Sequence, residues 1–254
     1  MSQHTKVALV TGGSRGLGKN MALKIAEKGL DVILTYHSKQ AEAEAVAQQI
    51  RTQGQRAAIL QLDVANPAGI SQFVEQVQKV LAEEFGTSKI DFLVNNAGIG
   101  LHTPIGEATE EQFDRLMNVH LKSVLFLTQA LLPHMQDGGG VISISSGLAR
   151  FALPGYSVYA AMKGAIEVLT RYQAKELGGR GIRSNVIAPG AIETDFGGGA
   201  VRDNEQLNQM VGGMTALGRP GLPEDIGGVV AFLCTEEARW INAQRIEVSG
   251  GMLI

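Results

Sequence analysis

The sequence predicts an α/β protein: a single domain of 254 residues built on a parallel β-sheet with helices on both faces. Three observations lead to this prediction. Short β-branched and apolar runs alternate with longer segments of helical periodicity along the whole chain. The apolar runs are nearly continuous, as expected for strands that are buried on both faces. A glycine-rich turn follows the first apolar run, where doubly wound sheets commonly bind ligands.

Strands are expected where β-branched and apolar residues run together and a glycine or polar residue follows. The predicted strands are residues 6–13, 31–36, 57–64, 90–98, 139–147, 182–190 and 245–251. The segments between them read mostly as helical crossovers. Such crossovers are right-handed, so the sheet is expected to be doubly wound.

The first helix is expected over residues 14–29. Leu17, Met21 and Ile25 recur at four-residue spacing, which places their side chains on one helix face. Gly29 follows the last of them and is a typical stop signal.

The next two helices also have recognisable ends. Residues 40–54 form a helical pattern that closes at its last residue, a glycine. Asn66 followed by Pro67 is typical of a helix start, with an N-cap and a proline at the first helical position. The third helical pattern then runs through residues 70–86.

Two helices are expected in the second half of the chain. Thr109 and Gln112 have the spacing of a capping box, which predicts a long helix from Thr109 toward Met135. A further helix follows the fifth strand and carries Tyr159.

One segment, residues 192–221, is long, polar and rich in glycine at both ends, and we read it as irregular. A loop of that length inside a compact domain is usually a functional lid or is disordered. It follows the C-terminal end of a strand, where such sheets bind ligands. We therefore expect a substrate lid, with disorder as the alternative.

The composition excludes several classes of partner. A formal net charge of −3 gives no electrostatic footprint for nucleic acid or an anionic membrane. No apolar run reaches the length that spans a bilayer. The N-terminal residues lack a secretory pattern, so we expect a cytoplasmic protein. The single cysteine, Cys234, excludes an internal disulfide and a Cys-based metal cluster, and its apolar surroundings predict a core position.

The turn TGGSRGLG, residues 11–18, lies between the first strand and the first helix. Its glycine spacing differs from strict G-x-G-x-x-G, but glycines still permit a tight turn and let the backbone approach a pyrophosphate. We expect a dinucleotide site here; the alternative is a purely structural turn. The turn residues assigned to the cofactor are Gly12, Ser14, Arg15, Gly16, Leu17 and Gly18.

The end of the second strand indicates which dinucleotide binds. An NAD site usually has Asp or Glu there, to accept hydrogen bonds from the ribose diol. The sequence instead reads Tyr36, His37, Ser38 and Lys39, and Arg15 lies in the glycine turn. Such donors and cations suit a 2′-phosphate, at roughly 1.5–3 kcal/mol per charge-assisted hydrogen bond. We expect NADP(H) in preference to NAD(H); the alternative is that the two long cations are solvated surface charges.

Tyr159 and Lys163 lie four residues apart in the stretch YAAMK. On a helix they share one face, one turn apart, and the ammonium would lower the pKa of the phenol from its usual value near 10. Hydride transfer from a nicotinamide to a carbonyl needs such a proton donor for the developing alkoxide. Lys163 can also reach the nicotinamide ribose. The alternative is two unrelated residues on a helix surface.

Two further polar residues have expected roles in the same chemistry. Ser146 lies at the C-terminal end of the fifth strand, where its hydroxyl can hold the substrate oxygen beside Tyr159. Asn118 is a poor helix former in the middle of a predicted helix. It is expected to hold a water chain behind Lys163, or else to be a tolerated polar residue.

In this order and spacing, these motifs resemble the short-chain dehydrogenase/reductase family over nearly the full chain. The resemblance implies a Rossmann fold with strand order 3-2-1-4-5-6-7, a homotetramer, and a catalytic set of Asn118, Ser146, Tyr159 and Lys163. The matching stretches are TGGSRGLG (11–18), DV (63–64), NNAG (95–98), Asn118, Ser146, YAAMK (159–163) and PGAIET (189–194).

The resemblance also assigns further residues to the cofactor. It implies that Asp63 and Val64 border the adenine, and that Ile192 and Thr194 touch the nicotinamide carboxamide. The other cofactor residues that it implies are Asn95, Ala97 and Gly98 on the adenosine side of the cleft, with Pro189 and Gly190 after the sixth strand.

Within the family, the sequence is most similar to the β-ketoacyl-acyl-carrier-protein reductases and related carbonyl reductases. Arg180 matches a basic residue that those enzymes use toward the carrier protein, although it also occurs widely in the family. The turn at residues 136–140, QDGGG, lacks the basic cluster that docking an acidic carrier requires. We therefore expect NADPH-dependent reduction of a ketone or β-ketoacyl thioester, with the acyl carrier protein a doubtful partner.

Two other interpretations of function stay open. The same site could oxidise a sugar, a polyol or another secondary alcohol with NAD(P). A non-catalytic cofactor-sensing protein could also use this fold, since fold alone does not fix function. A sensor, however, would have no reason to retain Ser146, Tyr159 and Lys163 together.

The remaining conspicuous residues suggest packing and assembly. His102, His120 and His134 are not spaced with carboxylates as metal ligands are, so we expect surface or packing roles and no metal site. Trp240 is expected in the core or in an interface. The apolar C-terminal stretch, GGMLI, suggests burial near a subunit contact.

Overall fold

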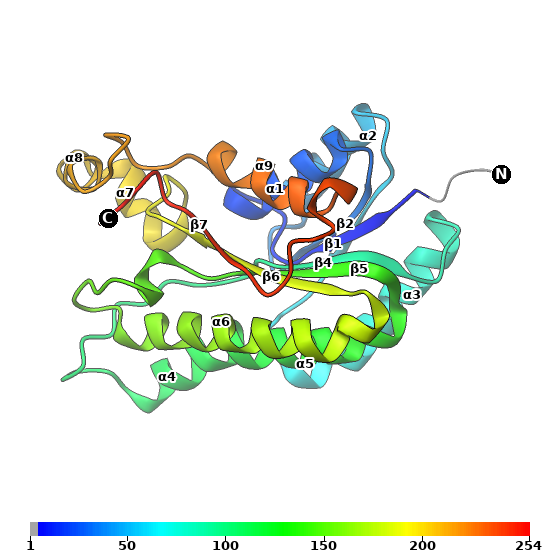
Figure 1. Ribbon diagram of the computed structural model, residues 1–254, viewed down its shortest axis with the longest axis horizontal. Helices are drawn as coiled ribbons and strands as arrows, with labels where there is room; N and C mark the ends of the chain where they lie inside the picture. The colour runs from blue at the N-terminus through cyan, green and yellow to red at the C-terminus, as the bar shows by residue number, and fades with distance from the viewer. Residues whose placement is uncertain (1–4) are drawn as a thin grey trace.

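A seven-stranded parallel sheet forms the centre of the computed structural model, which describes residues 5–254 (Figure 1). The strand order is β3-β2-β1-β4-β5-β6-β7, so the predicted doubly wound sheet and its order are confirmed. All strands belong to one sheet and form one domain; residues 1–4 of the predicted range lie outside the described residues. The strands are β1 (Val7–Val10), β2 (Asp31–Tyr36), β3 (Ala57–Gln61), β4 (Ile90–Asn95), β5 (Met135–Ile144), β6 (Arg183–Pro189) and β7 (Arg245–Val248).

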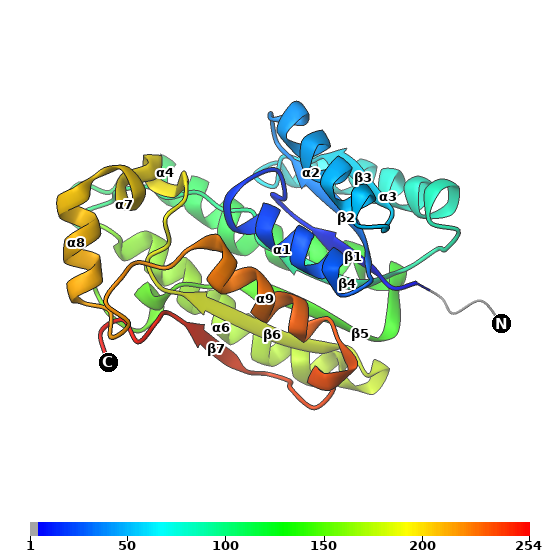
Figure 2. The same ribbon diagram turned by 90° about the horizontal axis from the view of Figure 1, so that it is seen from above.

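Helices cover both faces of the sheet (Figures 1 and 2). On one face α1, α2 and α9 pack together, while α3, α4, α5 and α6 cover the other. None of the helices within residues 5–254 is long and apolar enough to cross a membrane. The helices are α1 (Gly16–Glu27), α2 (Gln40–Thr52), α3 (Ile70–Glu84), α4 (Glu110–Met117), α5 (Ser123–Leu131), α6 (Ser157–Leu177), α7 (Ala200–Asp203), α8 (Glu205–Gly213) and α9 (Pro223–Leu233).

The central strand β1 shows why the strands have continuous apolar sequences. Its four side chains are fully buried. Ala8 and Val10 pack with α1, α2 and α9, whereas Val7 and Leu9 pack with the helices of the opposite face. Side chains alternate across a strand, so a strand between two helical layers needs an apolar residue at every position.

Strand β5 begins at Met135, earlier than the predicted residue 139. Its pairing with β4 is irregular between Ile90 and Phe92. A Cβ atom on Gly139 would lie 2.1 Å from the carbonyl oxygen of Asp91, so a glycine is required where the two backbones approach. This run of glycines was interpreted as a turn, but it is an irregular part of the strand.

The long helix predicted from Thr109 begins where expected but is interrupted in its middle. The capping box forms as expected, with Thr109 and Gln112 exchanging side-chain and backbone hydrogen bonds of 3.0 and 3.2 Å. The helix then widens into one π-helical turn, η2 (Asn118–Lys122), before continuing as α5. A 3₁₀ turn containing Pro133 follows, because proline does not continue an α-helix.

The segment 192–221, interpreted from the sequence as irregular, contains helices. It holds a 3₁₀ turn, η6 (Phe196–Gly199), followed by α7 and α8. The side chain of Asn204 caps α8 by accepting a hydrogen bond of 3.0 Å from the amide of Leu207. In Figures 1 and 2 these elements lie together at one end of the molecule, beyond the C-terminal end of β6.

Candidate active site

A cavity of about 890 Å³ lies at the C-terminal edge of the sheet. Its walls come from the turns after β1, β4, β5 and β6 and from segment 192–221. The strand order reverses between β1 and β4, and a crevice at such a reversal is where doubly wound sheets bind their ligands. The cavity volume falls within the range of ligand pockets, roughly 300–1,000 Å³.

Most of the residues predicted from the sequence line this one cavity. They come from stretches far apart in the chain, so the fold brings them together. The predicted residues that line the cavity are Gly12, Ser14, Arg15, Gly16, Leu17, Gly18, His37, Ser38, Asp63, Val64, Ala97, Gly98, Ser146, Tyr159, Lys163, Pro189, Gly190, Ile192 and Thr194.

Asn95 does not line the cavity, and Asn96 does. The side chain of Asn95 is buried and donates a hydrogen bond of 3.3 Å to Thr128 on α5. That of Asn96 donates instead to the carbonyl oxygens of Thr11 and Gly12, at 2.9 and 3.1 Å. Successive side chains of an extended chain point in opposite directions, so only one of the two asparagines can reach the glycine turn.

Tyr36 and Asn118 also lie outside the cavity lining. Tyr36 is half-buried and packs against the core beneath α1 and α2, while the next residues, His37 and Ser38, line the cavity. Asn118 is half-buried at the first position of the π-helical turn η2. Any contribution of its side chain to the site is therefore indirect.

The glycine turn is held in a shape that other residues cannot adopt. Gly12 and Gly16 have φ values of 67° and 54°, in the left-handed region that favours glycine. A Cβ on Gly18 would lie 2.1 Å from the carbonyl oxygen of Gly12. The hydroxyl of Thr11 accepts hydrogen bonds of 3.0 Å from the amides of Asn96 and Ala97, which ties this turn to the end of β4.

The N-terminus of α1 meets the requirements of a phosphate site. Arg15 occupies the N-cap position with an extended backbone, and its side chain makes no cap; the first turn also contains no acidic residue. Within the described residues, then, the first backbone amides of α1 have no side-chain cap. Amides at a helix N-terminus bind anions because the N–H groups and the helix dipole both favour negative charge.

Cationic and donor side chains surround one end of the cavity. His37, Ser38 and Lys39 line it after β2, and Arg15 lines it from the glycine turn. The Nη1 atom of Arg15 lies 3.5 Å from a carboxylate oxygen of Asp195 on segment 192–221. Arg15 and Lys39 are both exposed at their side chains, so a phosphate could approach them from solvent.

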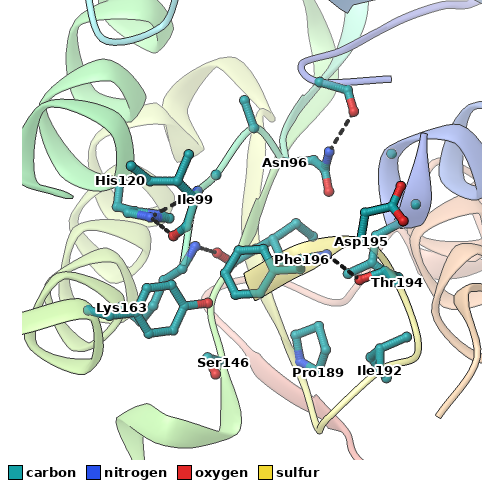
Figure 3. A pocket seen from close by; sticks show the side chains of 18 of the residues that line it. Asn96, Ile99, His120, Ser146, Lys163, Pro189, Ile192, Thr194, Asp195 and Phe196 are labelled. Carbon is teal, nitrogen blue, oxygen red and sulfur yellow. Dashed lines mark hydrogen bonds between the residues drawn. The ribbon is translucent and has the colours of Figure 1, made fainter. Parts of the chain in front are cut away.

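Helix α6 and the end of β5 bring the three expected chemical groups together. Tyr159 and Lys163 are both buried on one face of α6. The Lys163 Nζ lies 5.5 Å from the centre of the Tyr159 ring and donates a hydrogen bond of 2.6 Å to the carbonyl oxygen of Ile144. Ser146 follows β5 and lines the same cavity as Tyr159, and its hydroxyl accepts a hydrogen bond of 3.2 Å from the amide of Leu148. Figure 3 shows Ser146 and Lys163 beside the pocket.

Burial controls the protonation of both groups. It raises the pKa of Tyr159 above its usual value near 10, and the nearby hydroxyl of Ser146 works in the opposite direction. It lowers the pKa of Lys163 to about 7, because a buried ammonium loses its hydration. The expectation from the sequence that the pKa of Tyr159 is lowered is therefore wrong, because burial raises it.

His120 is a site residue that sequence reasoning missed. It is buried, lines the cavity, and packs edge-to-face against Tyr159 with ring centres 5.1 Å apart. Its Nε2 lies 2.8 Å from the carbonyl oxygen of Ile99, a contact drawn in Figure 3. Desolvation, with a smaller contribution from the charge of Lys163, lowers its pKa well below 6.5, so the ring is neutral. Its position two residues after Asn118 was the only available signal.

A partly buried ion pair supports the loop that carries Ser146. Glu167 of α6 accepts hydrogen bonds of 2.7 Å from the hydroxyl of Ser145 and from Nε of Arg245 on β7. Arg245 also binds Glu247 at 3.1 Å. The network joins α6, β7 and the end of β5, and no spacing in the sequence indicated it.

Comparison with known proteins agrees with this geometry. The family model described as enoyl-(acyl carrier protein) reductase matches residues 12–253. An uncharacterised oxidoreductase of Methylorubrum extorquens is 38% identical over 247 residues, covering 97% of each chain. A hydroxynaphthalene reductase-like protein of Metarhizium brunneum is 34% identical over 257 residues, covering 97% of this chain and 94% of the relative.

A solved structure shares both the fold and the sequence. The crystal structure of the angucycline C-6 ketoreductase LanV with bound NADP superposes with a TM-score of 0.93 at 37% identity, covering 98% of this chain and 96% of that one. This chain therefore belongs to the short-chain dehydrogenase/reductase family of oxidoreductases. The sequence resemblance to that family is confirmed.

Proposed function

We propose that this protein reduces a ketone on an apolar substrate to an alcohol, with NADPH as the hydride donor. The observation that carries the proposal is the convergence of Ser146, Tyr159 and Lys163 in one cavity with the glycine turn at the N-terminus of α1. A proton donor, an oxygen-binding hydroxyl and a phosphate site are the parts that such a reaction needs. A cofactor sensor would need only the last of them.

The cavity suits NADP(H) better than NAD(H). The uncapped amides of α1 and the left-handed glycines fit a pyrophosphate. Arg15, His37, Ser38 and Lys39 fit a 2′-phosphate, because they supply positive charge and donors where an NAD site needs a carboxylate. The bound NADP of the angucycline ketoreductase supports the same choice.

Other residues are proposed to hold the rest of the cofactor. Asp63 and Val64 line the adenosine end of the cavity and would border the adenine. Lys163 would bind the nicotinamide ribose. Ile192 and Thr194 would contact the carboxamide, since they line the cavity from the turn after β6. In place of Asn95, we assign Asn96 to support the glycine turn.

The protein would supply the proton and hold the substrate. The cofactor transfers a hydride to the carbonyl carbon. Tyr159 Oη then donates its proton to the carbonyl oxygen, and Ser146 holds that oxygen with a hydrogen bond. The ammonium of Lys163 stabilises the phenolate left behind, and Asn118 would order the water that returns a proton from behind Lys163.

The pKa shifts determine which groups carry protons before the reaction. Burial raises the pKa of Tyr159, so its hydroxyl stays protonated at neutral pH and has a proton to donate. His120 packs against Tyr159, and desolvation lowers its pKa so that its ring is neutral. The wall of the cavity formed by His120 therefore carries no charge. The only buried cation beside the phenol within the described residues is then Lys163.

The substrate end of the cavity is apolar. Its walls come from the stretch between Leu148 and Tyr156, from segment 192–221 and from Met252. A sugar or polyol would leave several hydroxyl groups without partners there, which costs free energy for each buried group. An uncharged ketone carrying apolar rings or chains fits better. The names of a hydroxynaphthalene reductase-like protein and an angucycline ketoreductase among the relatives support a cyclic ketone.

The surroundings of Arg180 argue against docking of a carrier protein. Its guanidinium donates to the carbonyl oxygens of Leu132 and Met135 at 2.8 and 2.6 Å and to Asp137 at 2.8 Å. These partners lie at the start of β5, and the cavity lies at the C-terminal edge of a parallel sheet. Arg180 would therefore be at the wrong edge for an acyl group to enter the site.

A screen for NADPH oxidation tests the proposal. Cyclic ketones, acyl thioesters, diketones and sugars would each be offered with NADPH, and the product identified by mass spectrometry. We expect a cyclic ketone to yield its alcohol in equal amount to the NADP⁺ formed. No ketone turnover, or oxidation of a sugar with NAD⁺ instead, would contradict the proposal. A cytoplasmic location also stays a proposal, to be tested by cell fractionation.

Cofactor choice has its own test. His37→Asp puts a carboxylate into the cavity lining just after β2, where it would repel a 2′-phosphate and accept hydrogen bonds from an NAD ribose. We expect the ratio of kcat/KM for NADPH to that for NADH to fall by at least about tenfold. His37→Asn has the same shape as the aspartate without its charge and should keep the NADPH preference. A parent enzyme that already prefers NADH would overturn the assignment.

A further inference from the structure

The side chain of Phe196 is a large apolar group exposed at the catalytic end of the cavity. It is the first residue of η6, on segment 192–221, and 46% of its surface is exposed. Its ring centre lies 5.8 Å from that of Tyr159, with the two planes inclined by 55°. Figure 3 shows the ring between Lys163 on one side and Thr194 on the other. A half-exposed aromatic ring beside the proton donor is available to contact a substrate.

Gly100 lies close against one edge of this ring. Gly100 has no side chain, and a Cβ atom there would lie 2.9 Å from Cε1 and 3.1 Å from Cζ of Phe196. Any larger residue at position 100 would push the ring away. With glycine at position 100, the ring of Phe196 keeps this position and stays partly exposed in the cavity. It presents a flat face there, which an aliphatic side chain would not.

Few interactions fix Phe196 in place. Its amide donates a hydrogen bond of 3.2 Å to the Thr194 hydroxyl. The preceding residue, Asp195, pairs with Arg202 at 2.5 Å. The residues that follow are Gly197, Gly198 and Gly199, with φ values of 62°, 77° and 79°.

Three consecutive left-handed residues are accessible only to glycine at low cost. A Cβ on Gly197 or Gly198 would meet nothing within 4 Å, so lack of space is not the reason for glycine there. The reason is the left-handed backbone conformation. The glycines thus set the direction in which the chain leaves Phe196, and with it the position of the ring.

We propose that Phe196 is the residue that selects planar aromatic ketones, by stacking on the ring next to the reacting carbonyl, and that Gly197–Gly199 hold it in that position. This inference rests on the proposed ketone reduction. A planar ring matches the flat face of Phe196, and offset aromatic pairs are more favourable than their buried area alone. Other residues at this end of the cavity also suit an aromatic substrate. Met210, Met214 and Met252 line it, and thioethers contact aromatic rings favourably.

The test compares two substrates in each variant. We would measure kcat/KM for a planar aromatic ketone, 1-tetralone, and for cyclohexanone, which offers the same carbonyl without the aromatic ring. Phe196→Leu keeps an apolar side chain but removes the flat face. We expect the 1-tetralone to cyclohexanone ratio to fall about three- to tenfold. Phe196→Tyr retains the ring and should keep the ratio of the parent.

Leu217→Ala is the matched control. Leu217 is an exposed apolar residue of the same segment, 72% exposed and outside the cavity lining. This variant should leave the ratio unchanged. An equal loss of kcat/KM for both ketones in Phe196→Leu would show that the ring only covers Tyr159, and an unchanged kcat/KM for both would show that it does not touch the substrate. Either result overturns the inference while leaving ketone reduction intact; no turnover by the parent enzyme would instead refute the proposed function.

A double-mutant cycle tests the role of the glycines. Gly198→Ala adds a methyl group in open space, so its effect comes from the left-handed backbone alone. If Gly198 acts by holding Phe196, the substitution should lower the 1-tetralone to cyclohexanone ratio in the parent and have no further effect in Phe196→Leu. Equal effects in both backgrounds would show that the glycines act independently of the ring.

Discussion

Tyr159 and Lys163 lie at the buried end of the cavity, and desolvation shifts their pKa values in opposite directions. The phenol is held in its neutral form, and the lysine is brought to the point where it titrates near neutral pH. The geometry of the pair was predictable from the spacing of the two residues on a helix. The pKa shifts were not, because they depend on how much of the sheet and of segment 192–221 covers the pair.

These shifts predict the pH dependence of reduction. Lys163 has a pKa of about 7, so it is an ammonium below that pH and neutral above it. Tyr159 stays protonated throughout because its pKa is raised. We expect kcat/KM for NADPH to be level at low pH and to fall about tenfold per pH unit above about 7.

The measurement is a pH–rate profile from about pH 5.5 to about 9.5, since kcat/KM reports the free enzyme. Ser146→Ala should be slower at every pH but should show the same step, because it leaves Lys163 in place. A rate that is constant through pH 9, or that rises with pH, would show that the charge of Lys163 is not needed for reduction.

At the scale of elements, the contact between α1 and α9 fixes the helix that follows the glycine turn. A Cβ on Gly227 of α9 would lie 1.9 Å from Oδ1 of Asn20 on α1, so glycine allows the two helices to approach. Gly228, the next residue, points into open space. The close approach holds α1, and therefore the amides at its N-terminus, against the sheet.

Two neighbouring substitutions should therefore behave differently. Gly227→Ala should lower the free energy of unfolding by about 1–3 kcal/mol, because a methyl group overpacks the interface. Gly228→Ala should be neutral or raise it by about 0.5–1 kcal/mol, because alanine favours the helix. Denaturant unfolding measures both, and NADPH binding should weaken only in Gly227→Ala. Equal changes in stability would mean that the helices do not meet as closely as described.

The elements themselves were largely predictable, and the exceptions have local causes. Buried parallel strands need apolar residues at every position, so β1, β2 and β4 were plain in the sequence. The glycines before Val141 were interpreted as a turn, because glycine is common in turns. They are present because this strand passes too close to Asp91 for residues with side chains. The helices of segment 192–221 were missed because polar, glycine-rich sequences carry little periodicity. The π-helical turn at Asn118 was missed because no pattern in the sequence marked it.

The site follows the same division. Residues of contiguous motifs, such as the glycine turn and the pair on α6, were found from the sequence. His120 and Phe196 were not, because their importance comes from contacts with Tyr159 that only the folded chain creates. Asn95 was chosen over Asn96 because a motif does not reveal which of two adjacent side chains faces the turn.

At the scale of the whole molecule, exposed apolar side chains lie on the helices of one face of the sheet and elsewhere on the surface, including the C-terminal stretch. The helices α4, α5 and α6 carry Phe113, Leu125, Phe126, Val168 and Tyr172, between 39% and 63% exposed. Outside these helices, Leu217, Trp240 and Ile254 are between 72% and 95% exposed. Trp240 is therefore not in the core of the protomer. The C-terminal stretch is divided, since Met252 is buried and Ile254 is exposed.

Apolar side chains exposed on α4–α6 and at the C-terminal stretch suit the homotetramer that the sequence leads us to propose, because such an assembly with dihedral symmetry uses more than one contact. Phe126→Glu should break the contact made by α5, and deletion of residues 253–254 the one near the C-terminus. Met252 must be kept, because it lines the cavity. Sedimentation should give a tetramer for the parent, a smaller assembly for each variant, and a monomer for both together. A monomeric parent would refute the assembly.

The central claim is that Tyr159 donates the proton in an NADPH-dependent ketone reduction, and one substitution tests it most directly. Tyr159→Phe keeps the ring and its packing against His120 and Phe196, and removes only the hydroxyl. The measurement is kcat for alcohol formation at saturating NADPH, with the NADPH dissociation constant determined in parallel. We predict a loss in kcat of at least about 10²–10⁴-fold, with NADPH binding nearly unchanged. Turnover close to that of the parent would contradict the mechanism.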